Sequence, residues 1–224
     1  MLKVLLFLIF SMNILAYTNI SPLNFDERID GEGGYKEYTL FNTTKNRLTY
    51  KIYPEKIQDT FDMSKWVELY PRVLTLKPGE SKKIKVLVVA PDNLSKGEYL
   101  TNLCIKEIET PGEQSGDVKI FTNLKIELAG YVGDIKPILE IEKIVKNNNT
   151  ISINLKNKGL IRGKFELYLQ EDKEELKYLT TARIFKGEEK VVKERVPKDI
   201  TFQKKTKLVV LDIWGNKISE KNIN

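Results

Sequence analysis

The chain has 224 residues, of which 37 are Lys or Arg, 31 are Asp or Glu, one is Cys and none is His. Without His it has no Ser-His-Asp or Cys-His catalytic unit and no HExxH or Cys2His2 zinc site, and one Cys permits no intramolecular disulfide. The net charge of +6 is spread over alternating Lys and Glu. This pattern favours a well-solvated surface over a nucleic-acid partner, which would need a basic block.

Residues 1–16 have the pattern of a secretory signal peptide. Lys3 supplies a positive charge, residues 4–10 form an unbroken apolar run, and Ala16 is a small residue at the expected cleavage point. The apolar run is shorter than the ~20 residues of a transmembrane helix, so we expect no stable membrane anchor. The sequence therefore predicts an exported protein, and its near-absence of Cys and its Lys- and Asn-rich composition favour the bacterial periplasm.

An N-terminal immunoglobulin-like domain is predicted over residues 17–133. Its apolar segments are short, rich in β-branched and aromatic residues, and bounded by turn residues, which is typical of strands. The predicted strands lie near 18–29, 35–41, 47–54, 65–76, 81–90, 98–109 and 117–130. Their number and spacing are those of an immunoglobulin-like sandwich. The Pro-Gly pair in Lys77–Glu80 predicts a type II turn that closes a hairpin.

A second β-sandwich is predicted over residues 134–224. Its expected strands lie near 138–145, 150–156, 163–170, 175–185, 189–195 and 205–213. A short helix is the alternative over 169–181, but apolar alternation on both sides of a charged tip favours a hairpin. No close sequence repeat relates the two domains. The predicted fold class is all-β, with two immunoglobulin-like β-sandwich domains after a cleaved signal peptide.

No cluster of residues carries a pattern of catalytic chemistry. Glu107 and Glu109 share one face of a predicted strand, but the neighbouring Lys residues indicate a solvated face instead of an acid-base pair. The acidic residues between Asp26 and Asp30 lack the pattern of a calcium loop. Cys104 lies between apolar residues and is expected to be a packed thiol. We therefore expect a binding protein and not an enzyme, with no metal site and no cofactor.

The middle of the first domain resembles a known family. The relevant segments are residues 71–80 (PRVLTLKPGE), 84–86 (IKV), 97–99 (GEY) and 103–105 (LCI), preceded by 20–22 (ISP) and 39–42 (TLFN). Their order and spacing resemble the N-terminal domain of PapD-like periplasmic chaperones of pilus assembly. The resemblance implies two immunoglobulin-like domains and a chaperone that donates a strand to a secreted, β-rich, pilin-like subunit. It also implies an outer-membrane usher as the next partner.

The last predicted strand of the first domain offers such a donor strand. Apolar residues, interrupted by one Thr, fall on one face of it: Val118, Ile120, Thr122, Leu124, Ile126 and Leu128. By the resemblance, the first part of this stripe binds the subunit, with Val118, Ile120, Thr122 and Leu124 as the candidate contacts, while the rest packs in the chaperone's own core. The alternative is that the whole stripe is the inner face of an ordinary last strand.

The resemblance also implies an anchor for the subunit's terminal carboxylate. The family uses an Arg on the first strand and a Lys on the last one, and the matching positions here are Asp26 and Glu127. Arg28 and Lys125 each lie two residues away, on the same faces, and are therefore the candidate anchor residues. The sequence leaves undecided whether two copies pair as a homodimer through this edge strand when no subunit is bound. The alternative function is a structural or adhesive cell-envelope protein without chaperone activity.

Overall fold

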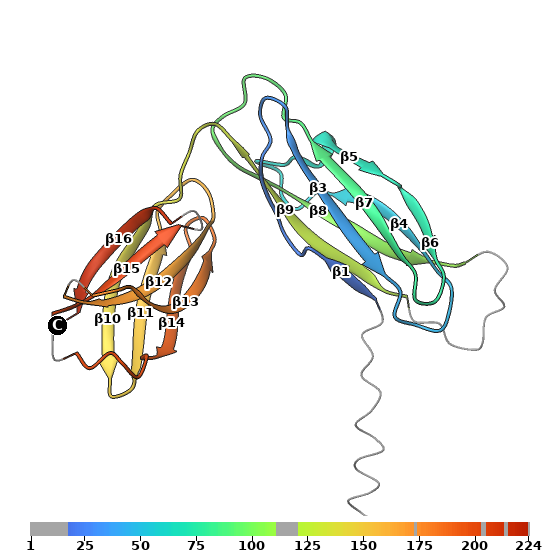
Figure 1. Cartoon of the computed structure of the whole chain (residues 1–224). Coiled ribbons are helices and arrows are strands. Elements are labelled where there is room, and N and C mark those ends of the chain that lie inside the picture. The colour runs from blue at the N-terminus through green and yellow to red at the C-terminus, as the bar shows by residue number, and fades with distance from the viewer. Residues whose placement is uncertain (1–17, 111–120, 173, 203–204, 213–214, 224) are drawn as a thin grey trace, which may run out of the picture. The chain divides into compact units, whose positions relative to one another are not determined.

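The structure of the chain is a computed structural model, and it describes residues 18–110, 121–172, 174–202, 205–212 and 215–223 (Figure 1). The expected signal peptide over residues 1–16 lies outside these ranges. The chain forms two compact units. The first contains the chain up to Ser95 and Tyr99–Val132, and the second contains Lys96–Glu98 and the chain from Gly133 onward. No helix in the described part of the chain is long and apolar enough to cross a bilayer.

The first unit packs two sheets, with strand orders β1-β3-β7-β5 and β2-β9-β8-β4-β6, around one core (Figure 1). The elements are Asn19–Ser21 (β1), Phe25–Arg28 (β2), Gly34–Phe41 (β3), Leu48–Glu55 (β4), Ser64–Trp66 (the 3-10 turn η1), Val67–Tyr70 (β5), Val73–Leu76 (β6), Ser81–Val88 (β7), Gly97–Ile108 (β8) and Asn123–Val132 (β9). The first two residues of β8, Gly97 and Glu98, belong to the second unit. Alternate residues of both sheets point inward. Tyr38, Tyr50 and Ile105 are fully buried between them.

The second unit is also a sandwich, with strand orders β10-β11-β14 and β13-β12-β15-β16. Its strands are Leu139–Asn147 (β10), Thr150–Asn157 (β11), Gly163–Glu171 (β12), Lys177–Ile184 (β13), Glu189–Arg195 (β14), Thr206–Asp212 (β15) and Lys217–Ile223 (β16). Ile153, Phe165 and Val210 are fully buried in its core. The all-β fold class is confirmed, and so is the hairpin over 169–181, because β12 and β13 pair antiparallel.

Two of the predicted strands are wrong in extent. The segment 18–29 forms β1 and β2, which belong to different sheets, and the segment 65–76 likewise forms β5 and β6. Pro22 and Pro71 lie at the two breaks. A proline has no N–H for the hydrogen-bond ladder, so continuous pairing ends there and the chain crosses to the other sheet.

The turn predicted at Lys77–Glu80 is present, but the hairpin is not. Gly79 has a φ of 71°, and the N–H of Glu80 donates to the carbonyl of Lys77 at 3.0 Å. The strands it joins lie in different sheets, since β6 pairs with β4 and β7 pairs with β3. The N–H of Gly79 donates to the carbonyl of Asn42, whose own N–H donates to the carbonyl of Glu80. These bonds make the turn a corner between the sheets.

The buried side chain of Asn42 holds this corner together at the end of β3. Its Nδ2 donates to the carbonyls of Asn46 (2.7 Å), Lys77 (3.1 Å) and Leu76 (3.3 Å), and its Oδ1 accepts the N–H of Thr44 (2.9 Å). One amide group therefore satisfies three carbonyls, of which that of Leu76 is buried and the other two are partly buried. A buried carbonyl that lacks a donor is costly.

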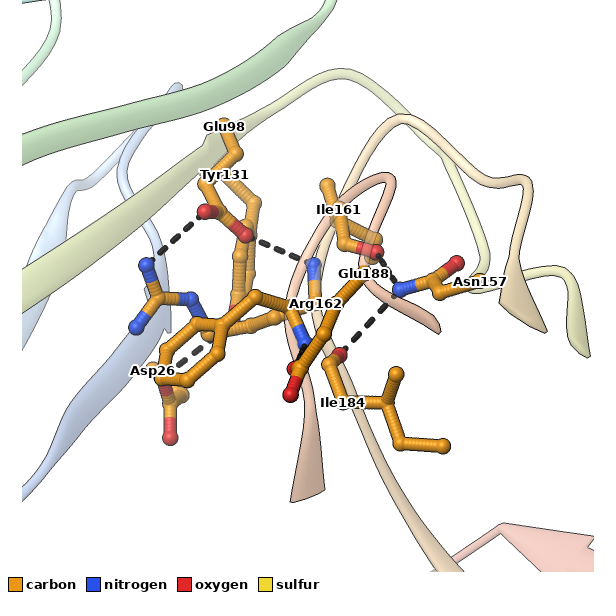
Figure 2. A network of polar contacts seen from close by, with 9 residues as sticks. Asp26, Glu98, Tyr131, Asn157, Ile161, Arg162, Ile184 and Glu188 are labelled. Atoms are coloured by element: carbon orange, nitrogen blue, oxygen red, sulfur yellow. Dashed lines mark hydrogen bonds and ion pairs between the residues drawn. The ribbon is translucent and has the colours of Figure 1, made fainter. Parts of the chain in front are cut away.

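Asn157 makes the same corner in the second unit, at the end of β11 (Figure 2). Its fully buried Nδ2 donates to the carbonyls of Ile161 (2.8 Å) and Ile184 (3.2 Å), and its Oδ1 accepts the N–H of Gly159 (2.9 Å). Its backbone N–H donates to the carbonyl of Glu188 (3.0 Å), as that of Asn42 does to Glu80. The two units therefore share a corner that the sequence did not reveal as a repeat.

A buried ion pair lies beside Asn157 in the second unit (Figure 2). Arg162 Nη2 is 2.8 Å from Glu98 Oε1, and the Arg162 N–H donates to Glu98 Oε2 at 2.6 Å. Their side chains are only 4% and 5% exposed, and the guanidinium also lies over the ring of Phe185. A charge removed from water is tolerated when it is both paired and hydrogen-bonded, as Glu98 is here.

Candidate functional site at a strand edge

Strand β9 has an apolar inner face, which Ile126 and Leu128 place in the core of the first unit. Leu124 is partly buried and packs against the margin of the same core. The period of two therefore aims the even-numbered residues inward along the described strand. The odd-numbered residues Asn123 and Lys125 face outward.

One edge of β9 is only partly covered. Its neighbours in the sheet are β8 and β2, and β2 pairs in parallel with Leu128–Tyr131 alone. Within the described residues, Asn123–Glu127 therefore has β8 on one side and no strand on the other. Unpaired N–H and C=O groups along such an edge are a template for a strand from another chain.

The proposed subunit contacts lie at the start of β9 and before it. Val118 and Ile120 fall outside the described residues. Thr122 is described and is bound to β8, since its carbonyl accepts the N–H of Glu107 at 2.8 Å. Its own N–H and hydroxyl both donate to Glu107 Oε2 at 3.0 Å. These bonds align the segment that leads into β9 with the end of β8.

Glu107 is the site residue that sequence reasoning misplaced. It was expected on a solvated face, but its side chain is only 6% exposed. The two bonds from Thr122 and the pairing of β8 explain why a carboxylate is retained there, because a buried carboxylate needs donors. The sequence carries only a weak signal for this burial, since Glu107 and Thr122 are far apart in the chain and meet only through the pairing of the strands.

The structure does not bring the two candidate anchor cations together. Arg28 lies opposite Tyr131 in the β2–β9 register, whereas Lys125 is six residues earlier on β9. At ~3.3 Å per residue this corresponds to a separation of about 20 Å along the strand. Arg28 forms an ion pair with Asp30, with Nε 2.5 Å from Oδ1.

Lys125 is paired with Glu55 on the outer face of the sheet. The hydrogen bond from Lys125 holds the pKa of the Glu55 carboxyl below its usual range, and the same bond raises the pKa of Lys125. Cys104 is buried close to this pair, and burial raises the pKa of its thiol to about 11. A thiol with such a pKa is protonated at neutral pH and is a poor nucleophile. The expectation of a packed thiol therefore agrees with its surroundings.

The fold defines the class of protein, which is a two-domain immunoglobulin-like sandwich. Its candidate site is the partly open edge of β9. No protein-family model matches the sequence, and no curated protein matches it. In structure, the chain is similar to the YadV chaperone, with a TM-score of 0.50 and 14% identity over 93% of this chain and 100% of that one. It is equally similar to the class 5 fimbriae chaperone CfaA, with a TM-score of 0.50 and 12% identity over 92% and 99%.

These similarities extend through both domains and not only through the first one. The chain therefore has the fold of these two chaperones, and the two-domain architecture that the sequence resemblance implies is confirmed at the level of the fold.

Proposed function

We propose that this protein is a periplasmic chaperone that binds an exported, β-rich, pilin-like subunit by strand addition at β9. The observation that carries the proposal is the uncovered edge Asn123–Glu127, which continues the apolar alternation at Val118, Ile120 and Thr122. In strand addition, backbone hydrogen bonds supply affinity, and alternate side chains fill a groove in the partner. The fold shared with the YadV chaperone and with the class 5 fimbriae chaperone CfaA supports this role.

The proposal needs no carboxylate anchor built from Arg28 and Lys125 together. Each cation already has an acidic partner, and the two lie far apart along β9. Affinity would come from the strand edge and its apolar side chains. Lys125→Met should then leave subunit binding unchanged, whereas a subunit held by its terminal carboxylate at Lys125 would be released.

Co-expression tests the proposal. The exported chain is produced with each β-rich subunit that the same cell exports, and the complex is recovered by a tag on the chain. We expect one subunit to co-purify and Ile120→Lys to abolish the complex, because a charge would enter the apolar groove. Phe121→Lys is the matched control, since Phe121 alternates to the opposite face and is already 43% exposed.

Amide hydrogen exchange gives a second measure of subunit binding, which does not depend on how much complex is recovered. In the complex, amides of Asn123–Glu127 that face the uncovered edge should become protected. Full binding by Ile120→Lys would exclude strand addition at this segment. Absence of any co-purifying subunit would favour the structural or adhesive alternative.

A further inference from the structure

A cavity of about 650 Å³ lies at one end of the second unit, away from β9 in the sequence and in a different unit. Its walls come from the turn between β10 and β11 and from the segment that follows β14. The lining residues that would contact a ligand include Asn148, Asn149, Arg195, Lys198, Ile200 and Phe202. A volume of this size falls in the range of small-ligand and side-chain pockets.

The cavity is cationic, and none of its described lining residues is Asp or Glu. Arg195 and Lys198 line it, and Lys146 Nζ lies 4.4 Å from the centre of the Phe202 ring. Within the described residues, neither Arg195 nor Lys198 has an acidic partner. The nearby Asp199 is already taken by Lys177, at 3.1 Å. The buried Glu171 carboxylate behind the wall accepts the N–H groups of Thr201 and Phe202. The cations Arg195 and Lys198 therefore remain to attract an anionic ligand.

Several backbone donors of the wall are already used. The N–H groups of Thr201 and Phe202 donate to Glu171 Oε1 at 3.3 and 2.7 Å, and the N–H of Val196 donates to the carbonyl of Asn149 at 2.9 Å. A compact phosphate is usually held by such free N–H groups. In this cavity the side chains of Arg195 and Lys198 must receive the anion instead.

The rest of the wall suits an apolar group. Ile200 is buried and Phe202 is half-buried, and both line the cavity. Phe202 has a φ of 58° and Asn148 a φ of 48°, both in the left-handed region. For Phe this is a disfavoured conformation, and such residues cluster where a ligand is held. The buried carboxylate of Glu171 accepts the N–H of Phe202 and so holds Phe202 in this conformation.

We propose that this cavity binds a carboxylate of an acidic peptide segment together with an adjacent apolar side chain. Arg195 would receive the carboxylate through two parallel N–H donors, and Lys198 would add a second charge. The apolar neighbour would pack on Ile200 and Phe202. The site uses no residue of β9 and is independent of the proposed chaperone activity.

Peptide titration followed by backbone amide NMR tests the site on the protein recovered after export. The probe is acetyl-Leu-Glu-Leu-amide, and acetyl-Leu-Gln-Leu-amide is its uncharged match. We expect saturable shifts at the amides of Asn148, Asn149 and Thr201, with the Glu peptide bound about tenfold more tightly, as expected for charge-assisted hydrogen bonds. The affinity should fall as salt is raised.

Variants separate the cavity from general surface charge. Arg195→Gln combined with Lys198→Gln should weaken the Glu peptide about tenfold, while Lys193→Gln should change nothing. Lys193 is exposed on the same strand and does not line the cavity. Equal affinity for the two peptides, or an unchanged affinity in the double variant, would overturn the proposal. Displacement of the peptide by equimolar inorganic phosphate would also overturn it, because the site would then be a general anion site.

Discussion

In the first domain the side chain of Asn42 closes the end of β3, and in the second domain Asn157 closes the end of β11 in the same way. The turns that dock onto them, Lys77–Glu80 and Phe185–Glu188, share only Gly and Glu in their last two positions. The two corners therefore have the same hydrogen bonds although their sequences differ. A chain that leaves one sheet for the other exposes carbonyls that need donors, and one buried amide supplies them.

The two domains differ in their last strands. β9 carries buried Ile126 and Leu128, and a short parallel strand covers its second half. Among the described strands, β16 pairs with β15 alone, and most of its side chains are exposed. A polar edge resists pairing with another chain, whereas an apolar one invites it. The difference explains why the strand edge of the first domain, and not that of the second, is the candidate site.

The shared corner predicts the largest effects on stability. Asn42→Ala should destabilise the first domain by about 4 kcal/mol and Asn157→Ala the second by about 3 kcal/mol, because the first removes the donor of one buried and two partly buried carbonyls and the second that of two buried ones. Amide hydrogen exchange measures each domain separately. Asn154→Ala, on the half-buried face of β11, is the control and should have little effect. Unchanged protection in the first domain of Asn42→Ala would exclude a stabilising corner.

The difference between the last strands gives the next prediction. Leu128→Ala should cost about 3 kcal/mol, because it leaves a cavity in a fully packed core. Ile218→Ala in β16 should cost only about 1 kcal/mol, since Ile218 is partly exposed at the core margin. Urea unfolding measures both values. Similar costs at the two positions would mean that the two last strands do not differ in burial as described.

The buried ion pair sharpens the comparison, because the first domain has no counterpart of it among its described residues. Arg162→Met should destabilise the second domain by about 3 kcal/mol, since it strands the Glu98 carboxylate away from water. Adding Glu98→Gln should recover part of that loss. Lys207→Met, which breaks the exposed pair with Glu220, should do little. If Glu98→Gln recovers none of the stability lost in Arg162→Met, the loss comes from packing and not from the unpaired charge.

Alkaline pH should affect the first domain through Cys104. Its folded pKa of about 11 lies above the ordinary value of a thiol. The stabilising contribution of the protonated thiol is therefore complete below the ordinary pKa and is lost as the pH rises toward 11. Unfolding at pH 8 and pH 10.5 should show a smaller loss of stability in Cys104→Ala than in the native protein. An identical loss would assign the effect to other groups, such as the buried Tyr38 and Tyr50, whose pKa values burial also raises.

The periodic features of the candidate site could be read from the sequence, but its contacts could not. Leu124, Ile126 and Leu128 were expected on one face because strand side chains alternate with a period of two. The burial of Glu107 depends on Thr122, which lies fifteen residues away and meets it only when β8 and β9 pair. The separation of Arg28 from Lys125 depends on the parallel register of β2 and β9, which no local pattern reports.

The prediction of the strands failed where proline or weak hydrophobicity was decisive. Pro22 and Pro71 interrupt segments whose apolar pattern is otherwise continuous, so the pattern alone predicts a single strand in each segment. β16 went unnoticed because Ile218 and Ile223 are its only apolar residues. That strand is stabilised by its pairing with β15, which is a tertiary interaction.

The sequence by itself determined that this protein is built from short strands in two domains, because alternation, turn residues and proline act locally on the backbone. It also determined an apolar stripe that runs into β9. Only the tertiary structure decided which strands are neighbours, which edge stays uncovered, and which charges are paired. These properties arise from contacts between residues far apart in the chain, since strand pairing and burial are set by the whole sandwich.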